Sequence, residues 1–327
     1  MICRNLLIIF QGRVNNIDER GQLMINKIGV IGAGKWGSAL AFALSEKNEV
    51  FITSRTPRDL ENFVGLEEIL RLKYLIIAIP AQQIGAWLKE NFSDQDRADT
   101  LKTKKVLVVA KGIEASSGRF LNEVYAPYVP EENICFLSGP SFASEVMKSL
   151  PTALVINSLN EALAQEFSML FPSFIKTYVS NDVAGAEVAG AYKNVIAIAA
   201  GICEGLGLGK NAAASLISRG LVEMERFGLR HGARVESFTG LSGAGDLFLT
   251  ASSRMSRNFR VGLGLAKGQS QEEILKELGE VAEGIGTSYA LHKIMSDENL
   301  YLPIATEVYK ILEGKDPKQS LKDLLEQ

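Results

Sequence analysis

The sequence predicts an α/β fold, with a sheet in the N-terminal half of the chain and an all-helical C-terminal half. Short apolar runs alternate with helical patterns from about Lys27 to Asn181, and such alternation is typical of a parallel sheet. Beyond Asn181, long segments rich in alanine, glycine and leucine have helical spacing and hold no strong strand candidate. The length of 327 residues suits two domains, because single hydrophobic cores stop growing at roughly 250 to 300 residues.

Six apolar runs are the predicted strands, at residues 27–31, 50–53, 74–79, 106–109, 134–137 and 153–156. The sheet is expected to end near Asn181, because Asp182 can cap a helix that begins at Val183. Residues 24–181 are therefore the predicted sheet domain, and residues 182–327 are the predicted helical domain. Residues 1–23 precede the first convincing strand and are expected to form a poorly ordered extension.

The composition excludes several classes of protein. A formal net charge of -3 argues against a general nucleic-acid binder. No stretch reaches the roughly 20 apolar residues of a membrane span without intervening charges. Cys3, Cys135 and Cys203 are widely spaced and unpaired in pattern, which favours a reducing, cytoplasmic location and predicts no metal site. Because histidine is scarce, a catalytic base is expected to be a lysine or a carboxylate.

A glycine-rich loop follows the first predicted strand and precedes a helical pattern at residues 38–46, which is the context of a dinucleotide-binding fingerprint. Gly32 permits the tight turn, Gly34 lets backbone N–H groups approach a pyrophosphate, and Gly37 allows close packing of helix on strand. The helix N-terminus stabilises the phosphate charge. We therefore expect a Rossmann-like, doubly wound sheet that binds a dinucleotide. An ordinary glycine turn is the alternative.

The end of the second predicted strand bears on the choice of cofactor. NAD specificity is usually marked there by an acidic residue that bonds the ribose hydroxyls. Ser54 and Arg55 occupy this position, and the Arg55 guanidinium can pair with a 2′-phosphate. We expect NADP to be accepted as well as NAD. In the alternative, Arg55 is only solvent-exposed, and Asp59 or Glu61 reaches the ribose.

Lys193 is the strongest candidate for a catalytic base. Its neighbours at helical spacing are all small or apolar: Ala189, Gly190, Ile196 and Ala197. Burial on such a dry face disfavours the ammonium form and lowers the pKa of the lysine. The amine is then competent to take a proton from an alcohol as hydride leaves the carbon. In the alternative, Lys193 is a snorkelling or salt-bridged lysine.

Segments from both halves of the chain together resemble the bacterial NAD(P)-dependent glycerol-3-phosphate dehydrogenases. They occur in order at residues 32–44, 111–112, 139–146, 187–209, 218–221, 240–247, 256–258 and 283–284. The resemblance implies interconversion of sn-glycerol 3-phosphate, a small phosphorylated three-carbon substrate, and dihydroxyacetone phosphate with NAD or NADP. That reaction supplies glycerophospholipid synthesis. The resemblance also implies a homodimer formed through the helical domain.

Carried over residue by residue, the resemblance assigns roles within the site. The implied catalytic residues are Lys193 as proton acceptor, Lys111, Asp246 and Thr250. The implied substrate contacts are Lys111, Gly139, Ser141, Lys193, Asn194, Asp246, Ser256, Arg257 and Asn258, of which the last three hold the phosphate. The implied cofactor contacts are Gly32, Gly34, Lys35, Trp36, Gly37, Arg55, Lys111, Ala143, Arg257, Val281 and Glu283. The residue types suit these roles, since a carboxylate can orient a lysine and a guanidinium fork suits a phosphate.

One segment departs from the family pattern. Members usually carry a longer loop between the second and third strands, whereas Arg55 here reaches Lys73 through a compact run. This puts in doubt cofactor contacts from that region and any lid it forms. Two other interpretations stay open: a related lysine-dependent two-domain hydroxyacid dehydrogenase, and a non-catalytic NAD(P)-binding sensor. The cluster at residues 256–258 argues against the first, and the joint presence of Lys111, Lys193 and Asp246 argues against the second.

Overall fold

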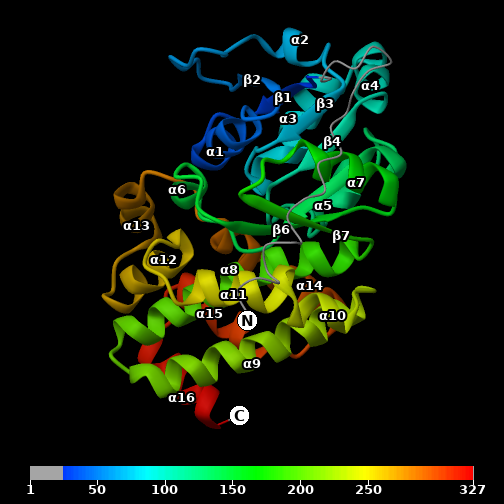
Figure 1. The fold of residues 1–327 in the computed structure, drawn as a ribbon. Coiled ribbons are helices and arrows are strands. Elements are labelled where there is room, and N and C mark those ends of the chain that lie inside the picture. Colours follow the sequence, from blue (N-terminus) through cyan, green and yellow to red (C-terminus); the bar gives the residue numbers. More distant parts are fainter. Residues whose placement is uncertain (1–24, 327) are drawn as a thin grey trace, which may run out of the picture.

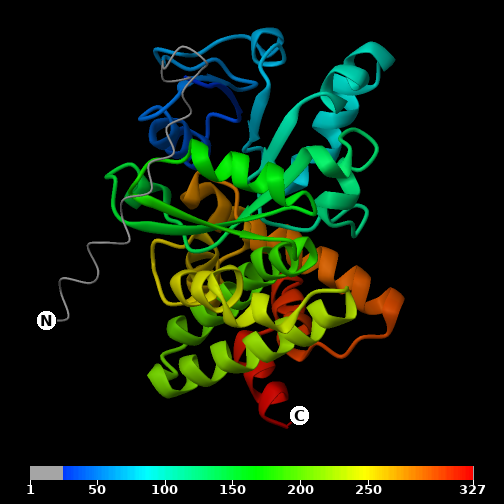
Figure 2. The ribbon, with the colours of Figure 1, turned by 45° about the vertical axis from the view of Figure 1, so that its right-hand side comes forward.

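The structure is a computed structural model, and it describes residues 25–326. A sheet covered by helices forms the N-terminal half, and a bundle of helices lies against one side of it, as Figures 1 and 2 show from two directions. Across the described residues, the predicted fold class is confirmed. The extension predicted at residues 1–23 lies outside the described residues.

Within residues 25–326, seven strands form a single sheet in the order β2-β1-β3-β4-β5-β6-β7. Their bounds are β1 (Lys27–Ile31), β2 (Glu49–Thr53), β3 (Tyr74–Ile77), β4 (Lys105–Val108), β5 (Ile134–Ser138), β6 (Thr152–Asn157) and β7 (Ile175–Ser180). The strand order reverses at β1, because β2 lies on one side of it and β3 on the other. Ligands of open α/β sheets bind at such a switch point, outside the carboxyl ends of the strands.

Helices cover both faces of the sheet, which makes the fold doubly wound. One face is covered by α1 (Lys35–Leu44), α6 (Ala143–Val146) and α7 (Glu161–Leu170). The other is covered by α2 (Leu66–Ile69), α3 (Ala81–Phe92), α4 (Gln95–Lys102) and α5 (Leu121–Tyr125), and a short 3-10 helix, η1 (Glu131–Asn133), precedes β5. The strands between them are buried on both faces and therefore appear in the sequence as continuous apolar runs.

Three features of the sheet differ from the prediction. β6 runs antiparallel to β5, because only the four-residue helix α6 lies between them and the chain turns back instead of crossing over the sheet. β7 is missing from the predicted strands, because it is an edge strand in which only Ile175 is buried while Lys176 and Tyr178 are exposed. β3 ends at Ile77 and not at residue 79, since Pro80 already leads into α3.

α8 (Val183–Gly205) is the central helix of the C-terminal half, and residues 185–203 on it are all buried. As predicted, the Asp182 carboxylate caps this helix by accepting the N–H of Gly185 at 3.0 Å. By length and composition α8 could cross a membrane, but its apolar stretch is entirely covered by the rest of the protein, as in the core helix of a folded domain.

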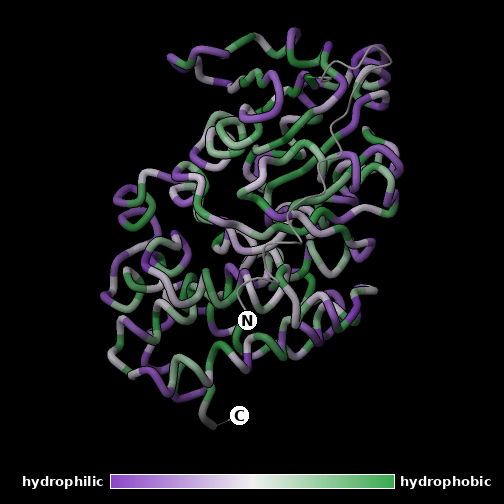
Figure 3. Tube along the Cα trace, in the orientation of Figure 1, coloured by the Kyte–Doolittle hydropathy of each residue, from purple (hydrophilic) through white to green (hydrophobic). Residues whose placement is uncertain are grey.

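The remaining helices surround α8. They are α9 (Gly209–Arg230), α10 (Val235–Thr239), the π-helix η2 (Leu241–Gly245), α11 (Asp246–Ala251), α12 (Arg257–Ala266), α13 (Gln271–Leu278), α14 (Glu283–Glu298), α15 (Pro303–Leu312) and α16 (Pro317–Glu326). Hydrophobic and hydrophilic stretches alternate along these helices in Figure 3, as expected when one face of each packs on the core.

Two glycines let α12 contact the backbone of α8. A Cβ atom added to Gly201 would lie 2.0 Å from the carbonyl oxygen of Phe259. One added to Gly262 would lie 2.0 Å from the carbonyl oxygen of Ile198. Because no side chain fits at either position, the two helices cross in direct contact, and the start of α12 comes close to the middle of α8.

Candidate active site

The glycine turn after β1 has the geometry that a dinucleotide requires. Gly32 has a φ of 115°, and a Cβ on it would lie 2.6 Å from the carbonyl oxygen of Ala78. A Cβ on Gly37 would lie 1.8 Å from the Gly32 carbonyl oxygen, so α1 packs on the turn only because glycine stands there. A Cβ on Gly34 would meet nothing within 4 Å. The first turn of α1 has no side-chain cap, so space and uncapped N–H groups suit a pyrophosphate.

Several predicted cofactor residues flank this turn. Lys35 begins α1, and its side chain is largely exposed. Trp36 and Ala143 pack on the same hydrophobic core, where α1 contacts α6. Arg55 is exposed just beyond β2, whose last residue, Thr53, accepts the N–H of Gly32 at 2.8 Å. The turn, the strand end and Arg55 therefore belong to one edge of the sheet.

The compact segment between Arg55 and Lys73 runs along the outer side of β2. Ile52 donates its N–H to the carbonyl of Asn62 at 2.9 Å and accepts the N–H of Val64 at 3.0 Å. The segment then forms α2, which packs on the face of the sheet that α3 also covers. It therefore extends the edge of the sheet next to Arg55.

Two lysines converge on one buried carboxylate beyond the strand ends. Asp246 accepts a hydrogen bond from Lys111 Nζ at 2.7 Å and one from Lys193 Nζ at 2.6 Å, on different carboxylate oxygens. Lys193 Nζ also donates to the Thr250 hydroxyl at 2.9 Å, and Lys111 Nζ donates to the Gly139 carbonyl at 2.8 Å. The Lys193 and Asp246 side chains are only 8% and 2% exposed. The structure thus brings the four predicted catalytic residues into one connected cluster.

Burial and charge set the proton affinities in this cluster. Burial lowers the pKa of Lys193 to about 8, although the Asp246 carboxylate acts in the opposite direction. Burial alone would raise the pKa of Asp246, but the ammonium groups of Lys111 and Lys193 outweigh it and hold that pKa below its ordinary value. Lys193 can therefore change its protonation state near neutral pH while Asp246 stays ionised, as a general base and its orienting partner require.

Three elements deliver the side chains of the cluster. Lys111 follows β4, Lys193 lies in the middle of α8, and Asp246 begins α11 directly after η2. The stem of Lys111 crosses α8 at Gly190, where a Cβ would lie 3.4 Å from the Cβ and Cγ atoms of the lysine. η2 is a π-helix. Such helices are rare in proteins, and many of those that occur lie at functional sites. Asp246 therefore stands at the junction of η2 and α11, within hydrogen-bond distance of both lysines.

The predicted substrate contacts lie around the same cluster. Gly139 has a φ of 102°, and its carbonyl also accepts the Ser141 hydroxyl at 3.2 Å. Asn194, next to Lys193 on α8, donates its amide to the Gly190 carbonyl at 3.1 Å. Its Oδ1 atom accepts a hydrogen bond from Asn258 Nδ2 at 2.8 Å. The amide pair connects the middle of α8 with the first turn of α12.

The segment predicted to hold the phosphate opens α12. This helix begins at Arg257, because the Ser256 hydroxyl caps it by accepting the N–H of Phe259 at 3.3 Å. Asn258 accepts the N–H of Gly284 at 2.9 Å and is buried. The Arg257 side chain is 41% exposed. Ser256 and Asn258 are therefore held by the protein, while Arg257 presents its guanidinium.

Glu283 has a structural role that the sequence did not explain. Its Oε1 atom accepts the N–H of Ala81 at 3.0 Å, so the first residue of α14 caps the start of α3. Burial raises the pKa of Glu283 to about 7, although the Ala81 N–H and the charge of Arg257 oppose this rise. Val281, just ahead of it, is 38% exposed. The bond from Ala81 to Glu283 therefore joins the start of α14 to the sheet half, and the exposed Val281 lies two residues before Glu283.

Glu280 is a residue of the site that sequence reasoning missed. Its carboxylate pairs with Lys35 at the start of α1 and with Arg257 Nη1 at 3.3 Å. One acid thus connects the cation beside the glycine turn with the cation of the predicted phosphate segment. A single glutamate in a short loop gives no signal in the sequence, since its partners Lys35 and Arg257 lie 245 and 23 positions away along the chain.

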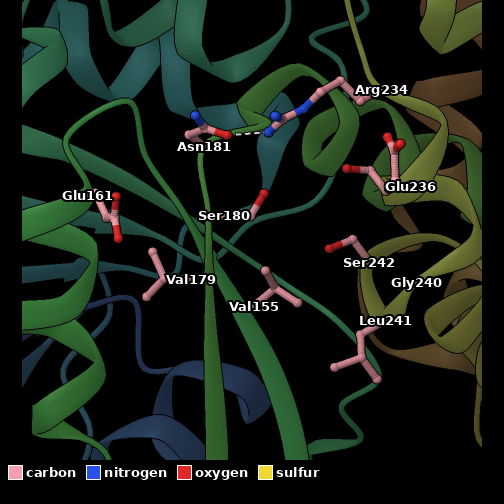
Figure 4. Close-up of a pocket in the computed structure, with 11 residues that line it drawn as sticks. Val155, Glu161, Val179, Ser180, Asn181, Arg234, Glu236, Gly240, Leu241 and Ser242 are labelled. Carbon is pink, nitrogen blue, oxygen red and sulfur yellow. Dashed lines mark hydrogen bonds between the residues drawn. The ribbon is translucent and has the colours of Figure 1, made fainter.

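A separate groove lies between strands β6 and β7 and the segment that contains α10 and η2 (Figure 4). Its lining includes Glu161, Arg234, Glu236 and Ser242, and Arg234 bonds to Asn181 across one end. The predicted site residues are not among those that line it. Among residues 25–326, no group of three or more histidine, cysteine, aspartate or glutamate residues is placed to hold a metal ion.

The doubly wound sheet, the open glycine turn and a buried lysine poised near neutral pH define an oxidoreductase of the dinucleotide-binding class. Comparison with known proteins gives the particular family. Residues 55–164 match the family described as NAD-dependent glycerol-3-phosphate dehydrogenase N-terminus, and residues 182–322 match the corresponding C-terminus. The chain belongs to the NAD-dependent glycerol-3-phosphate dehydrogenase family.

Individual relatives agree with this placement. The chain is 73% identical over 301 residues to glycerol-3-phosphate dehydrogenase (NAD(P)+) of Sulfurimonas denitrificans, which covers 92% of this chain and 99% of that protein. It is 59% identical over 300 residues to the protein of the same name from Nitratiruptor sp., and the match covers 92% of this chain and 98% of that protein. The crystal structure of glycerol-3-phosphate dehydrogenase from Coxiella burnetii superposes with a TM-score of 0.85 at 31% identity, covering 93% and 99%.

Proposed function

We propose that this protein interconverts sn-glycerol 3-phosphate and dihydroxyacetone phosphate with NAD(P)+ or NAD(P)H. The observation that carries this proposal is the cluster of Lys193, Asp246 and Lys111 beyond the strand ends, in a chain of this family. The nicotinamide cofactor supplies the chemistry of hydride acceptance or donation when it is bound. The residues of the chain then have to bind the substrate, orient it and move one proton.

Lys193 is the proposed proton acceptor. In the oxidation, the neutral amine takes the proton of the substrate hydroxyl, and the carbon that bears this hydroxyl gives up a hydride to NAD(P)+. The carbon–oxygen bond then becomes the carbonyl of the product. The Asp246 carboxylate and the Thr250 hydroxyl hold Nζ in place, at 2.6 and 2.9 Å. Lys111 places a second positive charge beside the reacting oxygen, which favours the developing negative charge. In the reduction, the ammonium of Lys193 returns the proton.

The proposed phosphate site is the start of α12. Arg257 offers a guanidinium fork, and the N-terminus of the ten-residue helix favours an anion. Asn258 and Ser256 fix the first turn through their bonds to Asn194, Gly284 and Phe259. Gly139 and Ser141 are proposed to contact the three-carbon part of the substrate, because they share the carbonyl that Lys111 binds.

An assay of nicotinamide absorbance tests this function directly. Purified protein is mixed with NADH or NADPH and with dihydroxyacetone phosphate, unphosphorylated dihydroxyacetone, or ketopantoate. Consumption of reduced cofactor with dihydroxyacetone phosphate, and much slower consumption with the other two, is the expected result. Turnover of ketopantoate alone would favour a hydroxyacid dehydrogenase. Cofactor binding with no turnover of any substrate would favour a sensor.

We propose that the protein accepts NADP as well as NAD. Arg55 is exposed at the end of β2, on the edge that carries the glycine turn, and its guanidinium suits a 2′-phosphate. We further propose a division of the chain at about Asn181, a homodimer formed through the helical part, and a cytoplasmic location. The product, sn-glycerol 3-phosphate, would supply glycerophospholipid synthesis.

A further inference from the structure

Glu187 is a buried acid of α8 that takes no part in the lysine cluster. Its Oε1 atom accepts the N–H of Asn122 at 2.9 Å, in the first turn of α5. Its Oε2 atom has no hydrogen-bond partner among the described residues. The carboxyl group thus connects the helix that carries Lys193 with a short helix of the sheet half.

The segment that Glu187 holds is paired with the segment that carries Lys111. Phe120, the residue just before α5, forms an isolated antiparallel bridge with Ile113, two residues after Lys111. The Phe120 ring also packs on Phe227 of the helical half, with centroids 6.3 Å apart. The chain from Lys111 to Asn122 is therefore a hairpin-like unit with one end in the catalytic cluster and the other end on Glu187.

A small cavity separates Glu187 from the backbone of the lysine segment. It is lined by residues that include Ala110, Lys111, Gly112 and Leu121, together with Glu187 itself. The stem of the Lys111 side chain packs on Gly190, which lies one helical turn after Glu187 on α8. Glu187 and Gly190 therefore contact the two ends of the same unit from a single helix.

We propose that Glu187 is a positioning residue that keeps Lys111 in register with Lys193 across the junction of the two halves. α8 carries Lys193 and Glu187 rigidly, so the bond to Asn122 fixes the Lys111 segment relative to the proton acceptor. The inference rests on the proposed function, because it takes Lys111 and Lys193 as the working pair. Loss of the bond is expected to let Lys111 withdraw from Asp246.

Glu223 offers a matched control within the same protein. It is also a buried glutamate that accepts backbone N–H groups at the start of a short helix, from Ile304 at 3.0 Å and Ala305 at 2.9 Å. It accepts the Tyr192 hydroxyl as well. Removal of Glu223 therefore creates a similar defect in burial and capping, but the hydrogen bonds it breaks are to Ile304, Ala305 and Tyr192 and not to the Lys111 segment.

The test compares Glu187→Ala, Glu187→Asp and Glu187→Gln with Glu223→Ala. The alanine and aspartate variants cannot reach Asn122, and kcat/KM for sn-glycerol 3-phosphate should fall by about tenfold to a hundredfold, as for a catalytic group misplaced by about 1 Å. The alkaline rise of the pH profile should move to higher pH, because the charge of Lys111 then lies farther from Lys193. Glu187→Gln keeps an acceptor oxygen and should restore most of the activity.

Acetylation of lysines, followed by mass spectrometry, gives a reading that needs no turnover. Lys111 should react faster in Glu187→Asp than in the wild type and at the wild-type rate in Glu223→Ala. If the wild-type protein does not oxidise sn-glycerol 3-phosphate, the proposed function fails, and this labelling still decides the positioning role. Unchanged labelling of Lys111 and an unchanged pH profile in Glu187→Asp would overturn the proposal, as would equal changes in Glu223→Ala.

Discussion

The Nζ atom of Lys193 lies 2.6 Å from a carboxylate oxygen of Asp246, in a site where both side chains are almost completely buried. The second oxygen of the same carboxylate binds Lys111 at 2.7 Å. One acid thus orients two lysines, and it remains ionised because both of them hold its pKa down against the effect of burial. The arrangement fixes the direction of Nζ before substrate arrives, and in the proposed reaction this lowers the entropy cost of proton transfer.

Arg257→Ala is expected to weaken binding of phosphorylated substrate specifically. A charge-assisted hydrogen bond contributes roughly 1.5 to 3 kcal/mol, so KM for dihydroxyacetone phosphate should rise by about tenfold to a hundredfold. The slow reaction with unphosphorylated dihydroxyacetone should change little. Arg254→Ala is the control, since Arg254 lies three residues earlier and pairs with Glu204. An equal rise of KM in both variants would contradict a phosphate role for Arg257.

Glu280→Gln is expected to tighten binding of the dinucleotide. Glu280 pairs with both Lys35 and Arg257, so an anion that uses these cations has to compete with its carboxylate. Because the pairs are partly exposed, the gain in affinity should be modest, up to about fivefold. The Kd for NADPH, measured by fluorescence, checks this result against Glu277→Gln on the neighbouring helix. Weaker binding in Glu280→Gln would show that the carboxylate supports the cofactor.

Arg55→Ala tests the basis of NADP acceptance. Loss of the guanidinium should raise the Kd for NADPH and leave the Kd for NADH nearly unchanged, because only NADPH carries the 2′-phosphate. Binding of both cofactors is measured before and after the substitution. An unchanged affinity for NADPH would reject the role of Arg55 and would point to other groups at the end of β2.

Glu187→Gln is expected to change the pH dependence of stability. Burial raises the pKa of Glu187 to about 8, while an unfolded glutamate titrates near about 4.3. Between these values the folded protein retains a proton that the unfolded chain has lost, so this group destabilises the fold progressively as pH rises. Glutamine cannot titrate. The Tm of the variant relative to the wild type should therefore increase from about pH 5 to about pH 8, and a constant difference would contradict the shifted pKa.

Patterns along the chain predicted the elements that are buried or locally determined. The glycine turn and the cap at Asp182 are recognisable because their chemistry lies within a few residues of sequence. The dry face of Lys193 follows from helical spacing alone. β7 was not predictable in the same way, because it is an edge strand with little buried surface. Its apolar residues are separated by polar ones, so it forms no continuous apolar run.

The contacts that organise the site across the two halves could not be predicted from local patterns. Glu187 interrupts an apolar helix, which signals that it has a role, but its partner Asn122 is 65 positions away. In the sequence, Glu280 cannot be distinguished from a solvent-exposed acid, because only the folded chain brings it next to Lys35 and Arg257. The antiparallel β6 depends on the path of the chain after β5 and has no signature of its own, since its residues are as apolar as those of a parallel strand.

The pH dependence of kcat/KM for oxidation of sn-glycerol 3-phosphate tests the central role of Lys193 most directly. Only the neutral amine accepts the proton, so the rate should rise with pH through an apparent pKa near 8, the value to which burial lowers the pKa of Lys193. The reverse reduction should fall over the same range. In Lys193→Ala, kcat/KM should drop by about a hundredfold to ten-thousandfold and the rise should disappear. Wild-type activity with the same rise in Lys193→Ala would contradict the account.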